Sequence, residues 1–316
     1  MKNLIIVLVV VIVIGFGAYL LTQWSSNPTV TTNQTPEEVI NIPPTLIIPL
    51  ASSTPPIVPE QTGETVIGQS VEGRAITAYH YPPSGETSGA GAKQILFIGG
   101  IHGGYSWNTT LLAYKLMDYL KGNPDMIPTQ VAVTVIPVLN PDGLNKVVGT
   151  TTGQFTKANV SPSTVVVTAG RFNANQVDLN RNFDCDWQAT GKWQNKTVSG
   201  GSAAFSEPES LALKNYVETL KPSAVVAWYS AAGGVFSSNC QNEIMPETKT
   251  ITNTYAQASG YPAYEKFNFY EITGDLVNWL AKNNIPAISV LLASHDNVEW
   301  DKNLAGIKAL LQFYAK

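Results

Sequence analysis

Apolar residues in this chain occur in two alternating patterns. Mainly apolar runs stand at residues 95–98, 131–139, 224–228 and 287–292. Such runs are typical of strands that are buried on both faces of a sheet. Between and after them, helical spacing of apolar residues occurs over 107–120, 206–220, 274–283 and 299–314. This alternation predicts an α/β fold: a three-layer sandwich whose mainly parallel, mixed sheet is covered by helices on both faces.

Several local signals refine this outline. Residues 65–67 and 75–79 flank a turn-rich segment and predict a hairpin. Ser206 followed by Glu209 reads as a capping box at the start of a helix. The NPDG segment at 140–143 reads as a turn.

Three long irregular stretches follow the predicted strands or a polar segment. They cover residues 144–170, 184–205 and 229–247. Because ligands of open α/β sheets bind beyond the carboxyl ends of strands, these stretches are expected to surround a site.

The first 63 residues differ from the rest of the chain. Residues 4–21 contain no charged residue and would span about 27 Å as a helix, close to the thickness of a bilayer core. No small-residue cleavage site follows, so an uncleaved anchor over 4–22 is favoured over a cleaved signal peptide. Residues 1–3 are then expected in the cytoplasm, with the rest of the protein outside it.

A proline-rich stretch follows the predicted anchor. Eight of the twenty prolines lie between 25 and 63, which indicates an extended linker over 23–63. The folded domain is expected at 64–316. The protein is therefore predicted to be a single-pass membrane protein.

Composition narrows the function classes. Apolar residues make up 44% of the chain, charged residues 13%, and the net charge is −4. This composition is that of a folded protein and gives no indication of nucleic-acid binding. The two cysteines, Cys185 and Cys240, lie in two of the irregular stretches, and in an exported protein they predict one disulfide, the alternative being two free thiols.

The most informative segment is RFNANQVDLNRNF at 171–183. It holds two arginines and four asparagines around one apolar pair. The planar guanidinium groups of Arg171 and Arg181 match the geometry of a carboxylate. A solvated, asparagine-rich loop with structural hydrogen bonds is the other interpretation of this composition.

The order of residues in this segment resembles the substrate-binding segment of zinc metallocarboxypeptidases, the carboxypeptidase A-like family. The spacing is closest to the carboxypeptidase N/E-type branch. The resemblance implies that Arg171 polarises the scissile carbonyl, while Asn180 and Arg181 grip the C-terminal carboxylate of a peptide. FYEITGD, at 269–275, resembles the segment with a substrate-binding tyrosine, here Tyr270. The resemblance covers about residues 64–316.

The same resemblance implies zinc as the cofactor of an active member. His102, in FIGGIHGGYSWN, matches the first ligand. The expected glutamate ligand, second histidine ligand and general-base glutamate are replaced by Tyr105, Tyr229 and Leu291. Such a peptidase needs three protein ligands and a base, so these replacements argue against hydrolysis.

The sequence is compatible with two functions. One is a membrane-tethered module that recognises peptide C-termini, for example of cell-wall peptides, and cleaves nothing. The other is an active carboxypeptidase or peptide amidase in which displaced ligands, such as His295 and Glu299, rebuild a zinc site with His102. Against the second stands an interpretation in which His295 and Asp296 cap the following helix.

Overall fold

Four parallel strands form the centre of the sheet. The computed structural model describes residues 63–85, 91–241 and 243–316. Within these ranges the strands are β1 (Gly63–Gln69), β2 (Ala75–Tyr81), β3 (Lys93–Ile98), β4 (Val131–Ile136), β5 (Thr190–Trp193), β6 (Lys196–Ser199), β7 (Ala224–Ser230), β8 (Gly234–Ser237), β9 (Ala263–Tyr264) and β10 (Ala287–Leu292). The main sheet has the order β1-β2-β4-β3-β7-β10-β8-β9, and β5 and β6 pair separately. β4, β3, β7 and β10 run parallel, whereas β1, β2 and β8 join through antiparallel pairs.

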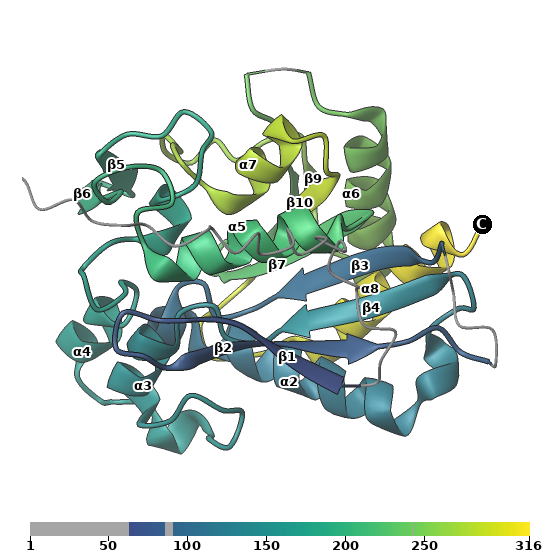
Figure 1. Ribbon diagram of the computed structural model, residues 1–316, viewed down its shortest axis with the longest axis horizontal. Coiled ribbons are helices and arrows are strands. Elements are labelled where there is room, and N and C mark those ends of the chain that lie inside the picture. The colour runs from purple at the N-terminus through teal and green to yellow at the C-terminus, as the bar shows by residue number, and fades with distance from the viewer. Residues whose placement is uncertain (1–62, 86–90, 242) are drawn as a thin grey trace, which may run out of the picture. The chain divides into compact units, whose positions relative to one another are not determined.

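Helices cover both faces of this sheet (Figure 1). They are α2 (Trp107–Gly122), α3 (Pro141–Val148), α4 (Thr164–Ala169), α5 (Pro208–Leu220), α6 (Pro246–Ser259), α7 (Leu276–Lys282) and α8 (Trp300–Tyr314). α2, α6 and α8 pack on one face, and α5 and α7 pack on the other. The predicted three-layer α/β architecture is therefore confirmed.

The strand residues alternate between the two hydrophobic cores. In β7, Val226 and Trp228 face α2, α6 and α8, while Ala227 and Tyr229 face α5 and α7. In β10, Leu291 lies on the same face as Tyr229, and the two residues are direct neighbours in the parallel register. The alternation of side chains along a strand thus places Tyr229 and Leu291 side by side.

Two predicted local signals are wrong. α5 begins at Pro208 after Glu207, without a side-chain cap, so Ser206 and Glu209 form no capping box. Proline is favoured at the first helical position, and it starts this helix two residues after Ser206. The NPDG segment is not a turn: it starts α3, with the Asn140 side chain accepting a hydrogen bond from the amide of Gly143 at 2.8 Å.

The stretches that were predicted to be irregular contain further elements. α3, α4, the β5–β6 hairpin and β8 all lie within or across them, and α6 was not predicted at all. β4 ends at Ile136, before the predicted end at 139, because Pro137 cannot continue the hydrogen-bonded ladder.

The predicted anchor at 4–22 and nearly all of the linker lie outside the described residues. Across residues 63–85, 91–241 and 243–316, none of the helices combines the length and the apolar character needed to cross a bilayer.

Candidate functional site

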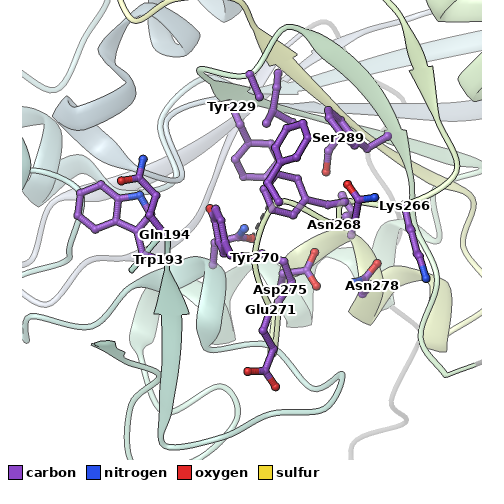
Figure 2. Close-up of a pocket in the computed structure, with 18 of the residues that line it drawn as sticks. Trp193, Gln194, Tyr229, Lys266, Asn268, Tyr270, Glu271, Asp275, Asn278 and Ser289 are labelled. Atoms are coloured by element: carbon purple, nitrogen blue, oxygen red, sulfur yellow. Dashed lines mark hydrogen bonds between the residues drawn. The ribbon is translucent and has the colours of Figure 1, made fainter. Parts of the chain in front are cut away.

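A pocket of about 830 Å3 opens beyond the carboxyl ends of β3, β7 and β10. His102, which follows β3, lines it together with Tyr229 of β7 and Leu291 of β10. Parallel strands end at the same edge of a sheet, and for this reason three segments far apart in sequence meet here. Figure 2 shows Tyr229 and Ser289 on one side of the pocket and Trp193 on another.

Arg171 and Asp178 form a buried ion pair in the wall of this pocket. The Arg171 side chain is 2% exposed and the Asp178 side chain 0%. Arg171 Nε donates to Asp178 Oδ2 at 2.9 Å, and Nη2 lies 2.8 Å from the same oxygen. Burial alone would raise the pKa of Asp178, but Arg171, with smaller contributions from His102 and Arg181, holds this pKa below its usual range. Arg171 is therefore fixed in place by a charged partner.

His102 lies beside this ion pair and has no hydrogen-bond partner on either ring nitrogen among the described residues. Its Nε2 is 3.6 Å from Asp178 Oδ1, and its ring centroid is 5.4 Å from that of Tyr229. Burial, followed by the charge of Arg171, lowers the pKa of His102 well below its ordinary value. The imidazole is consequently neutral at pH 7 and presents one N–H donor and one acceptor.

Tyr105 belongs to an aromatic wall of the pocket. Its ring meets Trp193 and His295 edge-on, at centroid distances of 5.0 Å and 4.5 Å. The Arg171 guanidinium lies over Trp193 at 4.5 Å and over Tyr105 at 5.7 Å, within the range of cation–π attraction. Tyr105 thus serves as a packing surface for Arg171.

Tyr229 connects the sheet to the asparagine-rich segment. Its hydroxyl donates to Asn180 Oδ1 at 3.1 Å, and the same oxygen accepts from the amide of Leu276 at 3.1 Å. Asn180 lines the pocket, and the nitrogen of its side-chain amide has no acceptor among the described residues. That nitrogen is available to a ligand.

Arg181 lies under the β5–β6 hairpin and does not line the pocket. Its Nε and Nη2 donate to the carbonyl of Lys192 at 3.0 and 2.6 Å, and its Nη1 donates to the carbonyl of Asn180 at 2.5 Å. The residue is 1% exposed, and the ring of Tyr270, which does line the pocket, lies 5.9 Å from its guanidinium. A grip of Arg181 on a ligand carboxylate stays a prediction.

The residues around His102 do not fit the three-ligand zinc site that the family pattern implies. Within residues 63–85, 91–241 and 243–316, one group of at least three histidine, cysteine, aspartate or glutamate side chains is close enough to share an ion. It consists of Cys185, Asp186 and Cys240, whose cysteines form a disulfide. His102 is not in that group, and tyrosines occupy the positions of its expected partners.

His295 and Glu299, the predicted displaced ligands, make their contacts in different places. His295 lines the pocket, but Glu299 Oε2 accepts from the amide of Ala293 at 2.6 Å and from the Tyr261 hydroxyl at 2.8 Å. The capping alternative is wrong: Glu299 itself is the N-cap of α8, without a side-chain cap bond. Asp296 instead pairs with Lys157 at 3.1 Å.

The predicted disulfide between Cys185 and Cys240 is confirmed, with a Cα–Cα distance of 5.9 Å. It joins the segment after the asparagine-rich stretch to the segment after β8, and the neighbouring Asp186 and Gln241 line the pocket.

Replacing both cysteines, with Cys185→Ala and Cys240→Ala, is expected to lower the free energy of unfolding. With a sequence separation of 55, the loop-entropy model gives about 4 kcal/mol. Urea unfolding of the double variant against the parent with its disulfide intact measures this loss, and a loss below about 1 kcal/mol would contradict it.

Three site residues were not predicted from the sequence: Asp178, Trp193 and Asp275. Asp178 had a readable signal, because a carboxylate between Arg171 and Arg181 in one segment suggests an internal counter-ion. Trp193 and Asp275 reach the pocket only through the hairpin and the loop before α7, and no local pattern indicates this.

Comparisons with known proteins point to one family. Residues 58–288 match the family model described as zinc carboxypeptidase. Gamma-D-glutamyl-L-diamino acid endopeptidase 1 of Lysinibacillus sphaericus is 24% identical over 200 residues, covering 58% of this chain and 50% of that protein. Carboxypeptidase D of Drosophila melanogaster is 25% identical over 296 residues, covering 80% and 20%. The chain thus spans half or less of the length of these two relatives.

Solved structures show the same fold. The murein-tripeptide amidase MpaA from Escherichia coli O157 aligns with a TM-score of 0.55 and 20% identity, covering 79% of this chain and 92% of that one. The carboxypeptidase A from Helicoverpa armigera aligns with a TM-score of 0.59 and 19% identity, covering 80% and 68%.

Proposed function

The chain belongs to the zinc carboxypeptidase family, and on this premise we propose that it captures peptides by a free C-terminal carboxylate without hydrolysing them. One observation carries the proposal: Arg171 and Asn180 present donors to a pocket in which Tyr105, Tyr229 and Leu291 stand where hydrolysis would need metal ligands and a base. Arg171 and Asn180 of the predicted binding residues line the pocket, and three positions that bond cleavage would need carry other residues.

The donors suit a carboxylate. Arg171 Nε donates to Asp178, and Nη2 is buried 2.8 Å from the same oxygen without a hydrogen bond, so Nη1 is the guanidinium nitrogen left for a ligand. The free amide nitrogen of Asn180 adds a neutral donor on the same pocket wall. Hydrogen bonds from a guanidinium to a carboxylate are roughly twice as strong as neutral ones. Arg171 and Asn180 would hold the carboxylate, while the Tyr270 ring borders the same space (Figure 2).

The positions at which the family pattern places the general base and two metal ligands hold Leu291, Tyr105 and Tyr229. Leu291 contributes no proton acceptor, and the neutral His102 is the remaining imidazole at the expected ligand positions. Burial, with a smaller effect from Asp275, raises the pKa of Tyr229 well above its ordinary value, so its phenol does not act as a base at neutral pH.

Cell-wall peptides are the ligand class that we propose. Two similar proteins are named for such chemistry, a murein-tripeptide amidase and a gamma-D-glutamyl-L-diamino acid endopeptidase.

We also propose that residues 4–22 anchor the chain in a membrane with the domain outside the cytoplasm, on the basis of the uncharged run at 4–21.

A second candidate is an active zinc hydrolase with displaced ligands. The observation that favours it is that His102 and His295 line one pocket, with three unpartnered ring nitrogens between them. Under this candidate the parent protein holds zinc and His295→Ala loses it. Under the binding proposal the parent itself holds well under one equivalent of zinc.

Calorimetric titration with matched peptides tests the binding proposal. The parent protein is expected to bind acetyl-Ala-Ala-norleucine as the free acid at least about tenfold more tightly than its C-terminal amide. Arg171→Lys keeps a charge beside Asp178 but loses the planar fork, so the preference should shrink. Lys266→Ala, at an exposed cation of the same pocket, is the matched control and should keep it. Equal binding of acid and amide to the parent would overturn the proposal.

A further inference from the structure

A second, largely apolar groove lies away from the pocket, beside the amino-terminal end of β4. It has a volume of about 690 Å3 and borders the end of β2, the end of α2 and the residues that lead into β4. Its apolar surface comes mainly from Tyr79, Tyr81, Pro83, Leu120 and Ile127. The pocket described above lies beyond the carboxyl ends of the parallel strands and shares no lining residue with this groove.

The chain enters the main sheet through this groove. Gly63, the first residue of β1 and the first that the structure describes, is part of the lining. Gly63 pairs with His80 in the antiparallel register, and β2 ends one residue later at Tyr81. Pro82 and Pro83 follow and have no amide hydrogen, so residues before Gly63 cannot extend this ladder as a regular strand. The segment that precedes β1 therefore starts from inside the groove.

Residues 54–62 have a composition that such a groove can hold. Their sequence, TPPIVPEQT, contains three prolines, the apolar pair Ile57 and Val58, and one charged residue. Proline fixes φ at about −65° and favours the extended polyproline II helix. Aromatic-lined grooves bind proline-rich segments of this kind, because the segment is extended beforehand and loses little conformational entropy on binding.

Tyr79 and Tyr81 supply the aromatic groups of the groove. They stand two residues apart on β2 and therefore on the same face of the strand, and both are half-buried. Burial raises the pKa of each phenol, so both are protonated donors at neutral pH. The Tyr81 hydroxyl has no hydrogen-bond partner among the described residues. A polyproline II segment has no internal hydrogen bonds, so one of its carbonyls can supply that partner.

We propose that residues 54–62 dock in this groove as a polyproline II segment and so tie the end of the linker to the domain. The segment is covalently joined to Gly63, so its binding is intramolecular, at an effective concentration on the order of 1 mM. If the separate peptide binds with a Kd of about 0.1 mM, this concentration keeps the groove occupied about nine-tenths of the time.

A peptide added in trans tests this inference on the full chain in detergent. The probe is a fluorescein-labelled peptide with the sequence of residues 54–62, and fluorescence anisotropy measures its binding. In a variant, nine glycine and serine residues replace residues 54–62, which empties the groove and leaves the domain sequence unchanged. The variant is expected to bind the peptide with a Kd of about 0.1 mM, and the parent about tenfold more weakly, because its own segment competes.

Matched controls examine the two contacts that the inference invokes. A peptide whose three prolines are replaced by alanine should bind the variant several-fold more weakly, because it lacks the preset extended shape. Adding Tyr81→Phe to the variant removes one hydroxyl and should also weaken binding of the proline peptide several-fold. Tyr119→Phe removes a hydroxyl on α2 that does not line the groove, and it should leave that affinity unchanged.

The possible outcomes decide between occupants. Equal binding of the peptide to parent and variant would mean that the groove is open in the parent, and it would refute docking of residues 54–62. Absence of binding to the variant, or equal binding of the proline and alanine peptides, would refute it as well, and neither result needs a substitution in the domain. Size-exclusion chromatography covers a second copy: a dimer formed by the parent and not by the variant would place the segment on a neighbouring chain and overturn the intramolecular docking.

Discussion

Combining Tyr105→Glu with Tyr229→His is expected to create a zinc site that the parent lacks. After dialysis at neutral pH, the parent should hold well under one equivalent of zinc, and the double variant about one. The apparent zinc affinity should rise at least about a thousandfold, because the ligand set grows from one imidazole to two imidazoles and a carboxylate.

The surroundings of His102 favour this outcome. Both ring nitrogens of His102 lack hydrogen-bond partners in the part of the chain that the structure describes, and the ring already lies 5.4 Å from that of Tyr229. An imidazole at position 229 would stand next to it, at the end of the neighbouring strand β7. The changes remove the bond from the Tyr229 hydroxyl to Asn180 and the edge contacts of Tyr105 with Trp193 and His295, so some stability is lost.

A matched control separates ligand gain from loss of tyrosine hydroxyls. The pair Tyr105→Phe and Tyr229→Phe removes both hydroxyls and adds no ligand, so its zinc content should stay at the parent level. One tightly held zinc in the parent would contradict the expectation, and its loss in His295→Ala would establish the displaced site. Metal analysis after dialysis measures the zinc content of the parent, of both double variants and of His295→Ala.

Hydrolysis should need one further change. Leu291→Glu restores a carboxylate at the pocket edge, beside position 229 in the parallel register. A general base contributes about 10²- to 10⁴-fold in rate, so the triple variant should exceed the double variant in release of a C-terminal residue by that factor.

Much of the fold was predictable because the strands are continuous apolar runs. β10 has the bounds that the run at 287–292 predicts, and both faces of that strand are covered. The missed helix α6 is rich in threonine and polar residues and buries Ile251 and Tyr255 on one side only, so its apolar pattern is weak. The hairpin β5–β6 is too short and polar to show a period.

The candidate site was predictable only where the sheet itself assembles it. His102, Tyr229 and Leu291 follow or end parallel strands, so topology brings them together. The partners of the arginines depend on tertiary packing: Arg171 pairs with Asp178 seven residues away, and Arg181 turns toward the Lys192 carbonyl of the hairpin. No periodicity encodes which acceptor a long side chain reaches, so Arg181 was expected in the pocket.

Asp178→Ala is expected to lower the free energy of unfolding at pH 7 by about 3–5 kcal/mol. The substitution leaves the guanidinium of Arg171 buried without its partner, and it removes the acceptor of the Asn180 amide at 3.1 Å. The matched control is Asp184→Ala, which breaks an exposed pair with Lys282 at 2.9 Å and should cost less than about 1 kcal/mol. Urea unfolding of the parent and both variants measures the difference, and similar losses in both variants would contradict the role assigned to Asp178.

The same carboxylate should shape stability in acid. Its folded-state pKa is held below the unfolded value of about 3.9, so its contribution is fully present above that pH and is lost as the pH falls through the folded pKa. The parent should therefore lose stability below about pH 4 more steeply than Asp178→Ala, which has no such group to protonate.

A double variant, Arg171→Met with Asp178→Leu, removes both charges. It should recover much of the stability that Asp178→Ala loses at pH 7, because a buried pair replaced by apolar groups is often neutral in stability. Recovery in the double variant together with loss of peptide binding would show that this ion pair is kept for the ligand and is not required by the fold.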